Sequence, residues 1–166
     1  DWKQALSIFA QSVAMEDKQD TWRKPSRRFG VISPGTKKDF RPRLLVAIDN
    51  SGSISKEIYD LFTAHMIKIS EVCEEVAVIG VDTQVNFEGK VEKGKAPSYK
   101  DIGSGGGTSF QPAFDYAKKH KFDGLVYFTD GGFFDQWVTR GIPVVFALCP
   151  EAQEVPGFRN IRITEE

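Results

Sequence analysis

The stretch LLVAIDNSGS, at Leu44–Ser53, determines how the rest of the chain is interpreted. Its first five residues are apolar at consecutive positions, a pattern typical of a strand buried on both faces of a parallel sheet. Asp49 ends this run, and Ser51 and Ser53 follow at alternate positions. Gly52 lets the backbone turn between the two hydroxyls. The stretch therefore predicts a buried strand that brings several oxygen atoms to one end of a sheet.

Apolar strands and amphipathic helices alternate along the rest of the chain. Ser55–Val76 has apolar side chains at helical spacing, with Ser55 as the N-cap, and Phe110–Ala117 has a second helical stripe. The other expected elements are strands at Val76–Val81, Leu125–Thr129 and Pro143–Leu148, an exposed strand or hairpin at Asp82–Val91, a polar loop at Lys93–Asp101 and an edge strand at Asn160–Thr164. This alternation predicts an α/β fold with a mostly parallel central sheet flanked by helices.

Oxygen-bearing side chains follow two of the predicted strands. In parallel sheets, ligands bind beyond the carboxyl ends of the strands, where the strand order reverses. Asp49 and Asp130 each follow a buried strand, and Thr108 lies on the glycine-rich loop GSGGGTS. Carboxylate and hydroxyl oxygens are the ligands that hard divalent cations prefer. Asp49 or Asp130 alone is better explained as a cap of a helix or turn, but the set Asp49, Ser51, Ser53, Thr108 and Asp130 predicts a cation site.

This set of residues resembles the metal-ion-dependent adhesion site of the von Willebrand factor A (VWA) family. The family's Asp-x-Ser-x-Ser motif matches Asp49 to Ser53, its loop threonine matches Thr108, and its later aspartate matches Asp130. The resemblance implies a three-layer Rossmann-like fold of the VWA type. It also implies that Asp49, Ser51, Ser53 and Thr108 hold Mg²⁺ or Mn²⁺, with Ca²⁺ as a further candidate, while Asp130 acts directly or through water. An acidic residue of a partner protein would complete the shell.

A second resemblance begins at Thr21–Phe29, TWRKPSRRF, and continues into the LLVAIDNSGSIS stretch. These residues are similar to a bacterial family in which a zinc-metallopeptidase-like region precedes a C-terminal VWA-like domain. The resemblance implies an N-terminal helix and basic linker at 1–42 and a VWA-like domain at 43–166. Asp1–Met15 would then be the tail of the preceding region, although its helical stripe could also pack on this domain. A cytoplasmic complex with a MoxR-type AAA+ ATPase is the implied setting, and peptidase chemistry is not assigned because the chain has no His-Glu-x-x-His motif.

Composition limits the remaining functions. No apolar run approaches the ~20 residues needed to cross a bilayer, so no membrane segment is expected. Cys73 and Cys149 lie among apolar residues and are expected to be reduced core thiols. Lys18–Arg43 has nine basic and two acidic residues and could contact nucleic acid. Its prolines and its few aromatic residues instead indicate a solvated connector, so nucleic-acid binding is a minor alternative.

The favoured function is a cation-dependent protein-binding module rather than an enzyme, because no histidine lies near the site in sequence and no Gly-x-Ser-x-Gly elbow is present. The catalytic alternative is a metal-assisted phosphohydrolase with Asp49 as nucleophile, although Ser51 stands where such enzymes need a second aspartate. A phosphate loop is disfavoured because no lysine follows the glycine run. The remaining candidates are expected to be structural: His65 and His120 as packed or surface residues, Asp82 as a turn residue, and Phe133, Phe134 and Trp137 as core residues.

Overall fold

A computed structural model of the chain describes residues 1–19, 25–26, 30–34, 41–50, 54–102, 107, 109–130, 136 and 138–164. Its elements are α1 (Trp2–Gln19), β1 (Pro25–Ser26), β2 (Gly30–Pro34), β3 (Arg43–Asp49), α2 (Lys56–Ser70), β4 (Glu75–Val81), β5 (Val85–Lys90), α3 (Tyr99–Ile102), α4 (Gln111–Lys119), β6 (Gly124–Thr129), β7 (Val144–Leu148) and β8 (Arg159–Arg162). A six-stranded sheet in the order β5-β4-β3-β6-β7-β8 forms the centre of the molecule.

The central sheet reverses its strand order between β3 and β6. All of its pairings are parallel except that between β4 and β5. From β3 the chain moves outward through α2 to β4 and β5, and it then returns to β6 on the other side of β3. Such a reversal is the position at which parallel sheets bind ligands.

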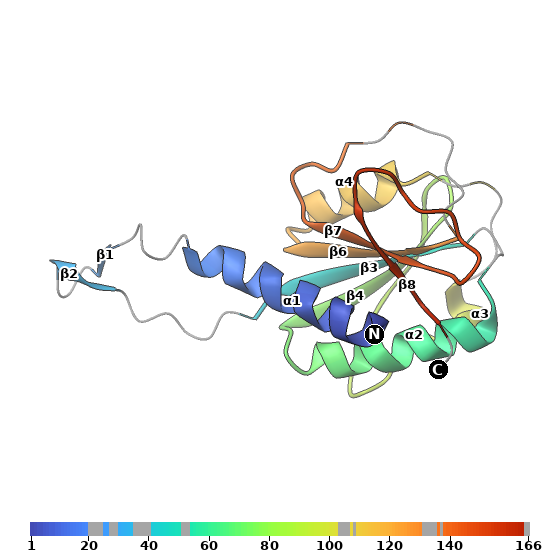
Figure 1. Cartoon of the computed structure of the whole chain (residues 1–166), viewed down its shortest axis with the longest axis horizontal. Helices are drawn as coiled ribbons and strands as arrows, with labels where there is room; N and C mark the ends of the chain where they lie inside the picture. The colour runs from blue at the N-terminus through green and yellow to red at the C-terminus, as the bar shows by residue number, and fades with distance from the viewer. Residues whose placement is uncertain are drawn as a thin grey trace.

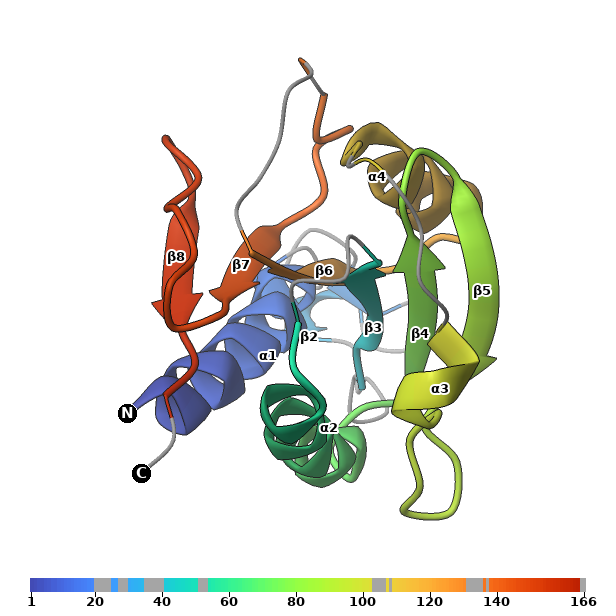
Figure 2. The same cartoon turned by 90° about the vertical axis from the view of Figure 1, so that its right-hand side faces the viewer.

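Helices cover both faces of this sheet. Figure 2, which looks onto the carboxyl ends of the parallel strands, shows α4 on one face and α1 and α2 on the other. The two inner strands are the most buried, and Leu45 and Ala47 of β3 and Leu125 of β6 are fully enclosed. Consecutive apolar residues are needed in such strands because both faces are covered. The predicted three-layer α/β fold is therefore confirmed.

Helix α2 begins at the predicted N-cap but ends earlier than predicted. The Ser55 hydroxyl accepts a hydrogen bond from the backbone N–H of Ile58 at 3.3 Å, so it satisfies one of the open donors of the first turn. The helix stops at Ser70, whereas the sequence predicted a helix to Val76. A turn that contains the buried Cys73 follows, and β4 starts at Glu75. The apolar residues of the turn and of the strand continued the helical stripe by chance, and the sequence pattern alone could not separate them.

Helix α1 packs on the same core as the sheet. Its stripe of Trp2, Leu6, Phe9 and Val13 is buried in that core, and the indole N–H of Trp2 donates to the backbone carbonyl of Thr164, just beyond β8, at 3.2 Å. Figure 1 shows α1 lying across the sheet beside α2. The observed packing corresponds to the second of the two roles that the sequence allowed for this helix. The domain boundary after residue 42 stays a prediction.

The connector that follows α1 contains two short strands that the sequence did not predict. β1 and β2 pair with each other in antiparallel fashion and form a sheet of their own. Most of the basic residues of Lys18–Arg43 lie outside the described residues, as do Phe133, Phe134 and Trp137.

The other predicted strands are confirmed with ends shifted by a few residues, and β8 is the predicted edge strand. The expected exposed strand is β5, whose side chains alternate between half-buried and exposed. Helix α3 was missed, because a helix of four residues is too short to show helical spacing. It lies at the end of the segment that the sequence analysis treated as a polar loop.

Cys73 and Cys149 are both buried and not joined in a disulfide, as predicted. In the part of the chain that the structure describes, no helix has the length and hydropathy required to cross a membrane.

His65 joins α2 to α1 through polar and aromatic contacts. Its Nε2 lies 2.8 Å from the backbone carbonyl of Lys3 and 3.4 Å from the hydroxyl of Ser7. The ring meets the edge of Trp2 at a centroid distance of 5.3 Å. Burial lowers the pKa of His65, and the charges of Lys68 and Lys3 lower it further, against the raising effect of the Lys3 carbonyl. The folded protein therefore favours the neutral imidazole.

We expect a fall in pH below about 6.5, the ordinary pKa of histidine, to weaken the packing of α1 on α2. Because the folded-state pKa is depressed, the stabilising contribution is present above about pH 6.5 and is lost as the pH falls through the folded pKa. Urea unfolding at about pH 7.5 and about pH 5.5 should show a drop in stability that is smaller in His65→Gln. The exposed His120 provides the control, since His120→Gln should keep the wild-type drop. An equal pH dependence in the wild type and His65→Gln would contradict this assignment.

Candidate functional site

Two neighbouring strands end in acidic residues at the point where the strand order reverses. β3 ends at Asp49 and β6 ends at Thr129, directly before Asp130. The two strands are paired in parallel with Ile48 opposite Phe128, so that Asp49 and Thr129 occupy corresponding positions. The Thr129 hydroxyl donates to Oδ2 of Asp49 at 2.8 Å. Asp49 is only 2% exposed, so the edge contains a buried carboxylate that is held by a neighbouring strand.

The electric field of these carboxylates extends to the next strand of the sheet. Burial raises the pKa of the Cys149 thiol to about 11, and the negative charges of Asp130 and Asp49 add to this effect. Burial also raises the pKa of Tyr127 well above its ordinary value, with a further contribution from Asp49. Both groups are therefore neutral at physiological pH. Their shifts indicate that the two aspartates act on one small region, since charge effects of this kind fall off with distance.

The loop after β3 is held at its start by the two strands on the other side. The backbone N–H of Asn50 donates to the carbonyl of Val81 at 3.0 Å, and its side-chain amide donates to Oδ1 of Asn86 on β5 at 2.6 Å. The amide of Asn50 passes over Gly80 of β4, where an added Cβ would lie 3.0 Å from Nδ2. A glycine at this position therefore allows the amide of Asn50 to reach β5.

The same loop is held at its other end by Tyr99 of α3. The Tyr99 hydroxyl donates to the carbonyl of Ile54 at 2.6 Å. Tyr59 of α2 in turn donates to the carbonyl of Pro97 at 2.6 Å, and the two tyrosine rings are 5.4 Å apart. The short helix that the sequence analysis missed thus fixes the chain directly after the DNSGS motif.

The end of the glycine-rich loop is fastened beside β4. The N–H of Ser109 donates to the carbonyl of Asp82 at 2.8 Å. A Cβ on Gly107 would lie 3.2 Å from Cγ2 of Thr83, so this part of the loop lies against the turn between β4 and β5. Residues from both sides of Thr108 therefore lie at the carboxyl edge of the sheet.

The structure places two of the predicted cation ligands. Asp49 and Asp130 are brought to adjacent strand ends, as the sequence predicted, whereas Ser51, Ser53 and Thr108 lie outside the described residues. Over the described ranges alone, no group of three or more His, Cys, Asp or Glu side chains could hold a metal ion. The full set of five ligands accordingly stays a prediction.

Sequence reasoning missed four residues that shape this edge: Thr129, Asn50, Cys149 and Tyr99. Thr129 is the last residue of β6, and Cys149 directly follows β7. A hydroxyl or thiol at the end of an apolar strand could have identified both residues as part of this edge. The partners of Asn50 and Tyr99 lie 36 and 45 residues away along the chain. No local pattern identifies contacts of that separation.

The strand order and the acidic carboxyl edge define an α/β domain of the VWA type. The family model described as VWA-like domain (DUF2201) matches residues 44–164, and the chain belongs to this family. A protein of Thermotoga maritima described only as uncharacterised is 35% identical over 133 residues, which are 79% of this chain and 33% of that relative. The chain thus spans about a third of the relative's length. No solved structure matches the chain.

The hydrogen bond from Thr129 to Asp49 should be measurable as stability. Thr129→Val keeps the shape of the side chain but leaves a buried carboxylate without this donor, so we expect the free energy of unfolding to fall by about 1.5–3 kcal/mol. Urea titration of the metal-free protein measures the loss. Thr63→Val is the matched control, because the buried Thr63 hydroxyl donates only to backbone carbonyls of α2. It should cost less than about 1 kcal/mol, and equal losses in both variants would rule out a special role for the bond.

Proposed function

We propose that this domain is a divalent-cation-dependent protein-binding module whose cation is held by Asp49, Ser51, Ser53, Thr108 and Asp130. The observation that carries the proposal is the buried Asp49 carboxylate at the reversal of strand order, hydrogen-bonded to Thr129 and followed on the neighbouring strand by Asp130. A charge buried at the rim of a sheet is costly unless it is paired or binds a cation. Mg²⁺ or Mn²⁺ suits the oxygen donors of this set, with Ca²⁺ as a further candidate.

The coordination of such a site favours the capture of a partner's acidic residue. Two carboxylates would balance the charge of a divalent cation, and the five side-chain oxygens would leave room for a further oxygen ligand. A carboxylate from another protein provides that oxygen. The proposed partner therefore presents an exposed Asp or Glu to the carboxyl edge.

The described groups at this edge favour binding over catalysis. Among the described residues, the Cys149 thiol and the Tyr127 phenol, which both respond to the charge of Asp49, are held in their neutral forms by raised pKa values. A general base or a thiolate nucleophile needs the opposite shift. Within the ranges that the structure describes, the phosphohydrolase alternative therefore depends on the two carboxyl groups Asp49 and Asp130.

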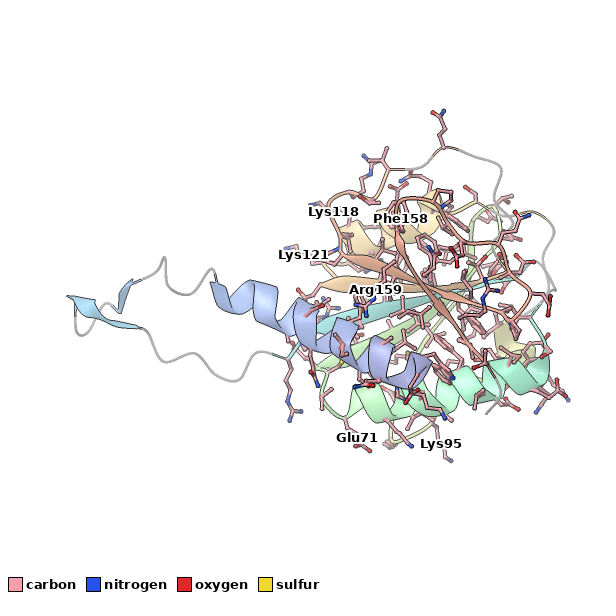
Figure 3. All side chains as sticks on the ribbon, viewed as in Figure 1. Glu71, Lys95, Lys118, Lys121, Phe158 and Arg159 are labelled. Carbon is pink, nitrogen blue, oxygen red and sulfur yellow. The ribbon has the colours of Figure 1, made fainter. Side chains whose placement is uncertain are left out.

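Nucleic-acid binding is supported less well. A hollow of about 480 Å³ at the amino ends of β6 and β7 is lined in part by Lys118, Lys121 and Arg140. Figure 3 shows Lys118 and Lys121 at the end of the sheet away from the acidic edge. Arg140 is already paired with Asp115 at 3.0 Å, so the hollow offers few cations for phosphates. We therefore keep RNA binding as the minor alternative.

The wider setting is also a proposal. The match covers 33% of the relative, and we propose that the domain works within a larger cytoplasmic assembly. A MoxR-type AAA+ ATPase is the candidate partner, on the resemblance described for the sequence.

Cation binding can be measured directly by isothermal titration of the protein with MgCl₂ and MnCl₂. We expect one site, and we expect Asp49→Ala to weaken binding by at least about 100-fold, because it removes a ligand rather than an outer-shell partner. Asp115→Ala removes an exposed carboxylate of α4 and should bind like the wild type. If the wild type binds neither Mg²⁺ nor Mn²⁺, or if Asp49→Ala binds them as tightly as the wild type, the proposal is wrong.

Partner binding should depend on the cation. We expect an immobilised domain in Mg²⁺ buffer to retain a partner that EDTA releases and that fresh Mg²⁺ restores, because the partner's carboxylate binds the ion itself. Mass spectrometry of the eluates identifies the protein, and its purified form is then tested with Asp49→Ala and Asp115→Ala. Retention that survives both EDTA and Asp49→Ala would show that the partner uses another surface.

A further inference from the structure

A chain of polar side chains runs from β4 through β5 to the start of the DNSGS loop. The Asp82 carboxylate accepts hydrogen bonds from the backbone N–H groups of Gln84, at 3.0 Å, and Thr83. The side chain of Asn86 lies near enough to this carboxylate to contribute to lowering its pKa. The other end of the Asn86 amide, Oδ1, accepts from Nδ2 of Asn50 at 2.6 Å. We call Asp82, Asn86 and Asn50 the polar relay.

The donors and acceptors of the polar relay set one orientation for each amide. Oδ1 of Asn86 accepts from Asn50, and the nearby ionised carboxylate of Asp82, which can only accept, favours this orientation of the Asn86 amide. Asn50 must then direct its own Nδ2 toward Asn86. The pKa of Asp82 is lowered, chiefly by the backbone hydrogen bond from Gln84, with Thr83 and Asn86 also contributing. The carboxylate thus stays ionised and keeps its acceptor role throughout the neutral range.

Asp82 also holds the glycine-rich loop. Its backbone carbonyl accepts from the N–H of Ser109 at 2.8 Å. Asp82, directly after β4, therefore binds the loop that ends after Thr108, and its neighbour Asn86 binds the start of the loop that follows Asp49. These loops carry three of the five proposed cation ligands, Ser51, Ser53 and Thr108.

The polar relay is not arranged for stability alone. Oδ1 of Asn50 is buried and has no hydrogen-bond partner among the residues that the structure describes, a condition that costs free energy in a folded protein. An added Cβ at Gly80 would lie 3.1 Å from Oδ1 of Asn86, so a side chain at this position would crowd the relay. An apolar residue at position 50 would avoid the unsatisfied oxygen. The amide of Asn50 is better explained by the position that its hydrogen bond imposes on the start of the DNSGS loop.

We propose that the polar relay of Asp82, Asn86 and Asn50 positions the two ligand-bearing loops of the cation site, with Asp82 as a positioning residue rather than a ligand. This inference rests on the proposed function, since the relay sets the geometry of the site described there. Outer-shell partners of this kind typically change metal affinity by 10–100-fold when they are replaced. The relay would give the cation site a preformed geometry before the ion arrives.

The test compares Asp82→Asn and Asn86→Ala with the control Asp123→Asn. Asp123 accepts the backbone N–H of Arg43 at 2.7 Å, so the control alters a carboxylate of the same kind at the amino end of the sheet. We expect both relay variants to bind Mg²⁺ at least about 10-fold more weakly by isothermal titration. Asn86 is exposed, so Asn86→Ala should fold even if Asp82→Asn does not. The control should keep the wild-type affinity.

A second measurement does not involve the cation. Amide hydrogen exchange of the metal-free variants, followed by NMR, should be faster at Asn50 and Ser109 and unchanged at β7. Unchanged exchange and affinity in Asn86→Ala would overturn the inference. Equal losses in the control Asp123→Asn would also overturn it, because the effect would then be one of general stability. If the wild type binds no Mg²⁺, the proposed function fails, and the exchange rates alone then decide whether the relay holds the two loops.

Discussion

The buried carboxylate of Asp49 is the constraint on which the arrangement of this domain depends. A charged group that is 2% exposed needs donors close by, and the Thr129 hydroxyl supplies one at 2.8 Å from the neighbouring strand. That bond requires β3 and β6 to end at the same level, which their parallel register provides. The reversal of strand order at this pair then leaves the edge open to a ligand.

The loops around this edge are each tied to a different part of the fold. The start of the DNSGS loop is fastened to β4 and β5 through Asn50, and its end is fastened to α3 through Tyr99. The glycine-rich loop is fastened to β4 at Ser109. These contacts rest on a rigid core of buried strands and on helices packed against both faces. A binding site on such a frame keeps its geometry between encounters with its ligand, which reduces the cost of binding.

Prediction from sequence worked best for the buried strands. Runs such as Leu44–Ile48 and Leu125–Phe128 have few other interpretations, because only covered strands are apolar at every position. It failed where the apolar pattern was ambiguous or short. The end of α2 was placed too late, since Cys73 and Val76 continued its stripe, and α3 has only four residues. The contacts of Thr129 and Asn86 were not predictable, because they join residues 80 and 36 positions apart.

The sequence by itself determined the α/β class, the family and the two acidic residues at the strand ends, because these depend on local composition and on motifs that the chain carries in order. Only the tertiary structure decided which strands are neighbours, that α1 packs on this core, and that Asp82 and Asn86 bind the ends of two different loops. Hydrogen bonds form between groups that are close in space, and the chain brings such groups together only after the sheet has assembled.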